Sequence, residues 1–236
     1  MPLYVYSITA AAHPCRLDGL TGVGAEPTPV RAVTTGRLRA VVSDIDEEIR
    51  PRRRDLAAHQ EVQDRLMADG TVLPLQFGYT APDDQAVTDV LLQHEDGYLA
   101  ALERVRDCAE YHVKASQDED VLLREILRDS DRARQLNDRI RGGDPDPRLP
   151  LELGELVAAE VGERQEDLAA GLVRTLVPLA RDHSVLAPAD GDVLSISLLV
   201  HDDEQDAFLR AEARLVADMG NVRLRLNGPL PPYSFV

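Results

Sequence analysis

The sequence contains no tryptophan, two cysteines and a single lysine, and each scarcity argues against a class of protein. Lys114 is the one lysine among 26 Lys and Arg residues, which face 42 Asp and Glu residues and leave a net charge of −16. Nucleic acids and anionic membranes bind basic surfaces, so we expect neither as a partner. Cys15 and Cys108 lie far apart without Cys-x-x-Cys spacing, which favours reduced thiols in the cytosol over a disulfide.

Long apolar runs are also missing. No uninterrupted apolar stretch approaches the roughly 20 residues that span a membrane. The first residues, 2–8, lack the basic start and apolar core of a signal peptide. With 44% hydrophobic and 29% charged residues, the composition is that of an ordinary globular protein. We therefore expect a cytoplasmic protein.

The sequence motifs of common enzymes are absent: there is no Walker sequence, Gly-x-Ser-x-Gly elbow or His-Glu-x-x-His. A glycine-rich stretch at 18–24 resembles a phosphate-binding turn, but Pro27 and Pro29 follow where a helix should open, so a surface loop is favoured. The run His201–Glu204 suggests a metal site only weakly, because Asp202 is also a plausible helix N-cap. We predict no catalytic, cofactor or metal site.

The first half of the chain mixes strands and helices. Alternation and breakers predict strands at 3–8, 30–33, 38–43 and 72–78, a helix at 55–69 ending before Gly70, and a helical block at 83–106 that Gly97 divides. His59 lies on the apolar stripe of the helix at 55–69. With no partner motif beside it, it is expected to be a buried core histidine rather than a ligand or base.

The second half is more regular. We predict a strand at 110–115, a long helix at 118–140, a helix at 151–179, strands at 184–187 and 193–200, a helix that Asp202 caps, and a strand at 222–226. With one helix set aside as an insertion this order is βαββαβ, as in ferredoxin-like folds. The predicted fold class is therefore α+β with two domains: 1–107, an N-terminal α+β domain, and 108–227, a modified ferredoxin-like domain. Residues 228–236 form a Pro/aromatic C-terminal tail.

Two short segments hold a large share of the nine Tyr and Phe residues. The first, at 72–79, contains a proline that suits an edge strand, and the second is the tail itself, which would fray unless it is tied down. Our hypothesis is that the tail packs on the body near Phe77 and Tyr79, or awaits a partner. The candidate docking residues are Pro74, Phe77, Tyr79, Pro229, Pro232, Tyr233 and Phe235.

Four segments together resemble the gas vesicle protein GvpF/GvpL family, in the family's order and over almost the whole chain. They are Leu-Tyr-Val-Tyr at 3–6, His59 with Val-Leu-Pro-Leu-Gln-Phe-Gly at 72–78, Glu-Tyr-His-Val-Lys at 110–114, and Gly-Pro-Leu-Pro-Pro-Tyr-Ser-Phe at 228–235. One departure is local: relatives often continue after Phe-Gly with Thr and an apolar pair, where this chain has Tyr-Thr-Ala-Pro at 79–82.

The resemblance implies a non-enzymatic, cytoplasmic gas vesicle assembly protein, either a minor vesicle component or a chaperone-like factor. It implies as partners the small hydrophobic shell protein and other vesicle proteins, with no nucleic acid, membrane or cofactor. It also implies two α+β domains, the second of modified ferredoxin-like fold, which agrees with the element order above. The alternative is a small-molecule-binding regulatory module or an enzyme on a ferredoxin-like sheet, a fold that hosts many functions.

Overall fold

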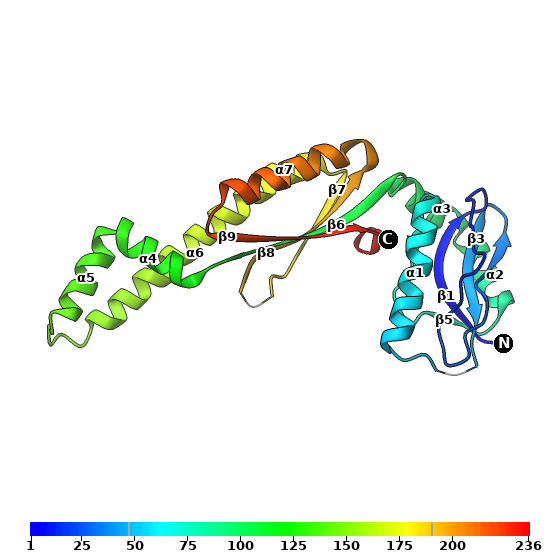
Figure 1. The fold of residues 1–236 in the computed structure, drawn as a ribbon, viewed down its shortest axis with the longest axis horizontal. Helices are drawn as coiled ribbons and strands as arrows, with labels where there is room; N and C mark the ends of the chain where they lie inside the picture. Colours follow the sequence, from blue (N-terminus) through cyan, green and yellow to red (C-terminus); the bar gives the residue numbers. More distant parts are fainter. Residues whose placement is uncertain (47, 190) are drawn as a thin grey trace. The chain divides into compact units, whose positions relative to one another are not determined.

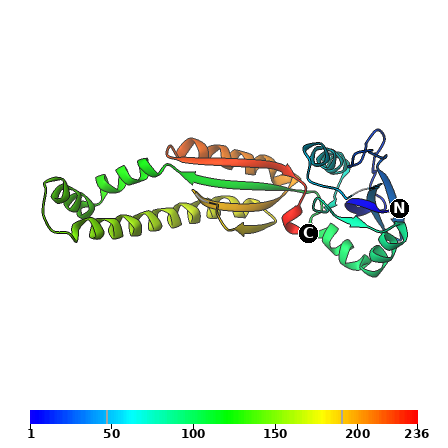
Figure 2. The same cartoon turned by 90° about the horizontal axis from the view of Figure 1, so that it is seen from below.

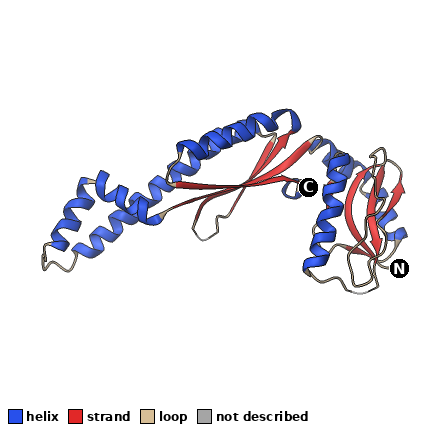
Figure 3. Cartoon of the chain, in the orientation of Figure 1, coloured by secondary structure: helices blue, strands red, loops and turns tan. Residues whose placement is uncertain are grey.

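A computed structural model describes residues 1–46, 48–189 and 191–236. It divides the chain into two compact units. Unit 1 comprises residues 1–111, 199–202 and 228–236, and unit 2 comprises residues 112–198 and 203–227. Both units contain helices as well as strands (Figure 3).

Unit 1 is organised around an antiparallel five-stranded sheet. Its strands are β1 (Leu3–Ala10), β2 (Arg31–Thr35), β3 (Leu38–Asp44), β4 (Leu73–Pro74) and β5 (Thr80–Ala81). The order is β2-β3-β1-β4, and β5 also pairs with β1. The β1–β3 register runs from Leu3 opposite Asp44 to Ala10 opposite Leu38, with a shift between Val5 and Ser7. The central strand β1 therefore lies between β3 and the short pair β4 and β5.

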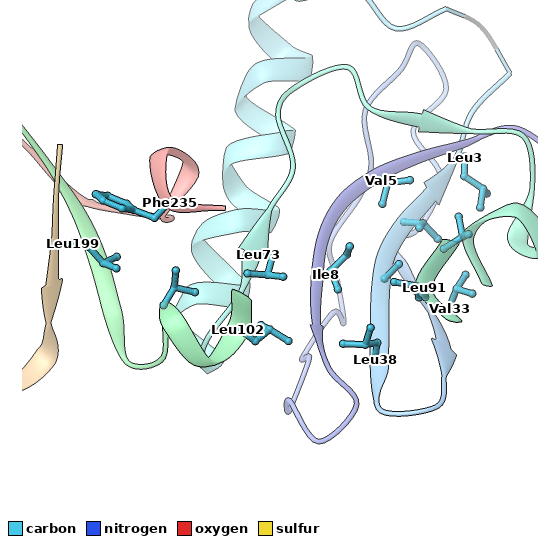
Figure 4. Close-up of a cluster of buried hydrophobic side chains, with 14 residues drawn as sticks. Leu3, Val5, Ile8, Val33, Leu38, Leu73, Leu91, Leu102, Leu199 and Phe235 are labelled. Carbon is cyan, nitrogen blue, oxygen red and sulfur yellow. The ribbon is translucent and has the colours of Figure 1, made fainter. Parts of the chain in front are cut away.

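Helices cover both faces of this sheet (Figure 1). On one face α1 (Arg53–Asp69) buries Val62 and Leu66 against Tyr4 and Tyr6 of β1. On the other face α2 (Asp84–Gln93) and α3 (Glu95–Arg104) contribute to a second buried cluster. Figure 4 shows that cluster, in which Leu3, Val5, Ile8, Leu91 and Leu102 are labelled. Because both faces of β1 are covered, its side chains are almost all buried.

Most of a four-stranded sheet lies in unit 2, while residues 108–111, 199–201 and 228–230 at the strand ends belong to unit 1. Its strands are β6 (Cys108–Gln117), β7 (Asp182–Leu186), β8 (Asp192–His201) and β9 (Val222–Leu230), in the order β7-β8-β6-β9. The helices α6 (Leu149–Leu176) and α7 (Gln205–Asp218) lie along one face of it (Figures 1 and 2). Two shorter helices, α4 (Glu119–Asp129) and α5 (Asp131–Arg141), pack on the first half of α6 around Leu122, Ile126 and Ala133. Short 3₁₀ turns lie at Val177–Leu179, Asp202–Glu204 and Tyr233–Phe235. Among the described residues no helix is both long enough and apolar enough to cross a membrane.

The strand predicted at 72–78 is wrong in its extent. Only Leu73–Pro74 pairs in the sheet, and the chain returns as Thr80–Ala81. Between them, Gly78 has a φ of +97° and its N–H donates to the Tyr4 hydroxyl at 2.9 Å. A side chain rather than a neighbouring strand therefore takes this backbone donor, although Leu75 and Tyr79 on either side still form backbone hydrogen bonds with β1.

Two predicted helices break at other places than expected. The helical block at 83–106 divides at His94, not at Gly97; Glu95 and Asp96 then occupy the first turn of α3, where carboxylates stabilise a helix N-terminus. The long helix predicted at 118–140 is two helices, because Ser130 is extended (φ −92°, ψ 108°) and its side chain caps α5 by accepting from the Ala133 N–H.

Asp202 is not the N-cap of α7. The cap position is Glu204, with no side-chain cap bond, and Asp202 begins the preceding 3₁₀ turn. The backbone N–H of Asp202 instead donates to the Asp107 carbonyl at 2.9 Å. Hydrogen bonding between the end of β8 and the residue before β6 thus extends to Asp202, two residues beyond the predicted end of the strand at 200.

Candidate functional site

The C-terminal segment (residues 229–236) is packed within unit 1. It leaves β9, passes through Pro231 and Pro232, which are both buried, and ends in the 3₁₀ turn at Tyr233–Phe235. Phe235 is only 6% exposed and belongs to the cluster that contains Leu102 and Leu199 (Figure 4). The segment therefore contributes a core side chain to unit 1.

His59 connects this segment to the sheet. Its Nδ1 lies 3.0 Å from the Tyr4 hydroxyl, and its Nε2 lies 3.0 Å from the Tyr233 hydroxyl. The Tyr4 oxygen also accepts the Gly78 N–H, and the Gln63 amide nitrogen, which can only donate, lies 3.4 Å from His59 Nε2. In either tautomer of the imidazole, one continuous chain of hydrogen bonds runs from Gly78 to Tyr233.

This chain is uncharged near neutral pH. Burial lowers the pKa of His59 to about 4 and raises the pKa of Tyr233 to about 12. Burial also raises the pKa of Tyr4, which the Gly78 N–H partly offsets. With a neutral imidazole between two neutral phenols, the ring nitrogens and the hydroxyls are all hydrogen-bonded and no charge is buried. A buried charge at this position would destabilise the fold.

Aromatic rings surround the imidazole. The ring centroid of Phe77 lies 5.7 Å from those of both Tyr4 and His59, and the Tyr4 and Tyr6 centroids are 4.8 Å apart. The Tyr6 hydroxyl lies 2.9 Å from Ser43 Oγ and accepts the Val23 N–H at 2.9 Å. These contacts hold the rings in place, and none of them involves the C-terminal segment.

A second anchor holds the segment through Glu110 of β6. The carboxylate is 5% exposed, accepts the Ser234 N–H at 2.9 Å, and accepts the Ser234 hydroxyl at 2.6 Å. Arg104 donates to the Phe235 carbonyl. Hydrogen bonds with an ionised partner are about twice as strong as neutral ones, so Glu110 and Arg104 fix the backbone on either side of Ser234.

The structure brings three of the seven candidate docking residues together. Pro74, Tyr79 and Tyr233 line one cavity of about 600 Å³. Phe77 packs against Tyr4 and His59 and does not line this cavity. The remaining three lie apart from it: Pro229 is exposed, Pro232 is buried, and Phe235 is in the core.

The sequence analysis missed Tyr4, Gly78, Arg104 and Glu110 as residues of this site. Tyr4 and Glu110 stand within the segments that carry the family resemblance, but nothing local signals a partner for either. Their partners lie 55 and 124 positions away along the chain, so only the fold brings them together. Among the residues that the structure describes, no group of three or more His, Cys, Asp or Glu side chains is placed to hold a metal ion.

Comparison with known proteins decides the family. The family of gas vesicle synthesis proteins GvpL/GvpF matches residues 2–236. The chain belongs to this family. Gas vesicle protein F of Streptomyces sp. (strain CB03234) is 41% identical, with 100% of both chains covered. Gas vesicle protein L1 of Halobacterium salinarum (strain ATCC 700922 / JCM 11081 / NRC-1) is 26% identical over 92% of this chain and 84% of that protein.

Two solved GvpF structures share the fold. The crystal structure of GvpF from Anabaena sp. PCC7120 has a TM-score of 0.85 at 21% identity, covering 99% of this chain and 97% of that one. The structure of GvpF from Microcystis aeruginosa has a TM-score of 0.79 at 23% identity, covering 99% and 98%. The predicted GvpF/GvpL relationship is thus confirmed, and so is a mixed fold of helices and strands.

The four segments that carry the GvpL/GvpF resemblance meet at the docked C-terminal segment. Tyr4 comes from the first, His59 and Gly78 from the second, Glu110 from the third, and Tyr233 and Ser234 from the fourth. Of these residues, His59 and Glu110 bond directly to the C-terminal segment, and Tyr4 and Gly78 are connected to it through His59.

Proposed function

We propose that this GvpL/GvpF protein is a non-enzymatic gas vesicle assembly factor that acts in the cytoplasm and binds the small hydrophobic shell protein, as a minor vesicle component or a chaperone. The family match over residues 2–236 supports the vesicle role. The observation that carries the binding step is the apolar cavity of about 600 Å³ beside the docked C-terminal segment. It gives an apolar partner a surface to bury.

The physical logic combines this surface with the charge of the chain. An apolar shell protein aggregates through exposed hydrophobic surface and unpaired strand edges. A partner that covers that surface and carries a net charge of −16 keeps the complex soluble, because like-charged complexes repel one another. Handing the shell protein to a growing vesicle then exchanges one apolar contact for another.

We infer that the chain folds as two domains, with boundaries near 107 and 227, and that the second is a modified ferredoxin-like domain. The support is the strand order β7-β8-β6-β9, which is 2-3-1-4 in chain order, together with two long helices on one face. In this interpretation α4 and α5 are the insertion into a βαββαβ arrangement. The C-terminal segment, with Pro229, Pro232, Tyr233 and Phe235, is proposed to dock on the first domain beside Pro74, Phe77 and Tyr79.

Co-expression with the small shell protein tests the function. The full chain is expected to keep the shell protein in the soluble fraction and to co-purify with it. A shell protein that aggregates to the same extent with and without this chain would rule out the chaperone function.

The second candidate, a small-molecule-binding module or enzyme, has one observation in its favour. The cavity volume lies within the range of ligand sites, roughly 300–1,000 Å³. Its lining includes no Asp, Glu, Lys or Arg side chain, and three of its polar side chains are tyrosines, a residue type that is enriched in protein interfaces. A protein partner therefore fits this surface better.

A further inference from the structure

An apolar groove runs along α2 and α3 in unit 1. The cavity of about 600 Å³ adjoins a second one of about 180 Å³, and the two share Ile8, Leu75, Tyr79 and Tyr98. The second cavity extends the surface to α2, where Val90 is 45% exposed. Tyr79, at 58% exposed, stands where the two meet. We call these two adjoining cavities the α2–α3 groove.

On the α3 side, the groove is lined by small residues. Gly97 and Ala101 lie four positions apart, and therefore on one face of the helix, and both line the larger cavity. A Cβ atom built at Gly97 would meet no heavy atom within 4 Å. This wall lets the backbone of a partner approach closely, while Tyr98 and Tyr79 supply aromatic surface of the kind that anchors interfaces.

The groove is lined by uncharged and apolar side chains together with His94, and the helices beside it are rich in carboxylates. None of the lining residues of either cavity is Asp, Glu, Lys or Arg. Asp83 and the helices α2 and α3 that follow it carry six carboxylates and one arginine, Arg104. Arg31 and Arg37 bind some of them, but Asp89 interacts with the uncharged Gln85 amide, at 2.8 Å. A partner that fits must be apolar on one side and basic on its flanks.

We propose that the α2–α3 groove binds an amphipathic helix of the small shell protein, with the apolar face of that helix in the groove and Lys or Arg residues beside the carboxylates of α2 and α3. This inference rests on the proposed function and specifies its surface. A helix is favoured over an added strand because β4 and β5 have two residues each and are bordered by Pro74 and Pro82. Proline offers no N–H for strand pairing, whereas a helix docks through side chains alone.

Gly97→Leu is the decisive variant, because it fills the groove from an exposed helix position and improves helix propensity. Its matched control is Gly154→Leu in α6, where the glycine is likewise exposed and a Cβ meets nothing within 4 Å. The probe is a synthetic 18-residue amphipathic helix of Leu and Lys, labelled for fluorescence anisotropy with the full chain. The reference peptide has the same Leu positions and Glu in place of Lys.

The full chain is expected to bind the Leu/Lys helix at least tenfold more tightly than the Leu/Glu helix. Gly97→Leu is expected to weaken binding of the Leu/Lys helix about tenfold, and Gly154→Leu to leave it unchanged. Asp89→Asn should weaken it less, and added salt should reduce the difference between the two peptides. Equal binding of the Leu/Lys helix by Gly97→Leu and the unaltered chain would overturn the proposal.

Two further outcomes separate this inference from the proposed function. If Gly97→Leu retains the shell protein in solution as well as the unaltered chain does, the groove is not the shell-protein surface, and the inference fails while the function stands. If the unaltered chain never retains the shell protein, yet the Leu/Lys helix binds in a Gly97-dependent manner, the function fails while the groove stands. A chain that sediments as a dimer, and as a monomer after Gly97→Leu, would show a second copy in the groove and would also overturn the inference.

Discussion

At the scale of single residues, His59 is the link between the sheet and the C-terminal segment, and Tyr233→Phe tests it. The substitution removes the hydroxyl that is hydrogen-bonded to His59 Nε2 and leaves this buried ring nitrogen without that partner. We expect the free energy of unfolding to fall by about 1–2 kcal/mol, measured by urea denaturation. Tyr79→Phe is the control, because Tyr79 is 58% exposed, and it should change stability by less than about 0.5 kcal/mol.

The same histidine gives a pH dependence with a defined sign. Because the pKa of His59 is lowered from 6.5 to about 4, the unfolded chain binds more protons than the folded chain between these values. The stabilisation is therefore complete above pH 6.5 and is lost as the pH falls towards 4, by at most about 3 kcal/mol. His59→Gln keeps a donor and an acceptor but does not titrate, so it should lose less stability than the unaltered chain over this range.

His13 makes that comparison necessary, since it is a second buried histidine whose pKa burial lowers. Its contribution has the same sign, but it is present in both proteins and cancels in the difference. Parallel losses of stability in His59→Gln and the unaltered chain would show that His59 does not carry the effect.

Gly228 of β9 packs closely against Glu110 and Tyr111 of β6. Its φ is +153°, and an added Cβ would lie 2.7 Å from Tyr111 Cδ1 and 2.9 Å from the Glu110 carbonyl oxygen. Gly228→Ala should therefore destabilise the protein by about 2 kcal/mol or more. Gly19→Ala, at a φ of +80° with no heavy atom within 4 Å, has only the backbone strain and should cost about 1 kcal/mol, both measured by thermal unfolding.

At the residue scale, the sequence could predict that a side chain is buried but not which side chains it bonds to. Helical periodicity placed His59 on the apolar stripe of its helix, and the side chain is 5% exposed. Its partners Tyr4 and Tyr233 lie 55 and 174 positions away, and no local pattern encodes such pairs. Proximity of the C-terminal segment to Phe77 could be guessed only because aromatic residues are scarce.

At the scale of elements, the C-terminal segment is expected to stabilise unit 1, and its deletion tests this. Removing residues 229–236 takes away the buried Phe235, the Tyr233 bond to His59 and the Ser234 bonds to Glu110. The stability of the fold should fall by at least about 3 kcal/mol, followed by urea denaturation. An unchanged denaturation midpoint would contradict this account of the segment.

Elements were predictable where one periodic pattern ran without interruption, as in β2, β3, α6 and β8. The failures were at breaks. Ser130 ends one helix and caps the next, and His94 divides another, at positions where the apolar stripe continues across the break. The strand at 72–78 failed for a different reason: Gly78 gives its N–H to the hydroxyl of Tyr4, a partner that no local pattern reveals.

At the scale of the whole molecule, unit 1 is assembled from both ends of the sequence. Leu199 and Phe235 belong to the same buried cluster as Leu3 and Leu102. A fragment of residues 1–111 should therefore lack a complete core, and the same fragment joined by a flexible linker to residues 228–236 should melt at a higher temperature. Equal melting of the two fragments, followed by circular dichroism, would show that the segment adds nothing to unit 1.

This composition of unit 1 has a consequence for biosynthesis. Domains generally fold as they emerge, the N-terminal one first, yet here the core that contains Leu3 is completed only when Phe235 leaves the ribosome. Until then Tyr4, His59 and Glu110 lack the contacts that Tyr233 and Ser234 provide, and the cavity beside α3 is incomplete. A ribosome that stops early would release a chain with this apolar site open, which marks the product for chaperones and proteases. A chain that lacks residues 229–236 therefore cannot complete the core of unit 1.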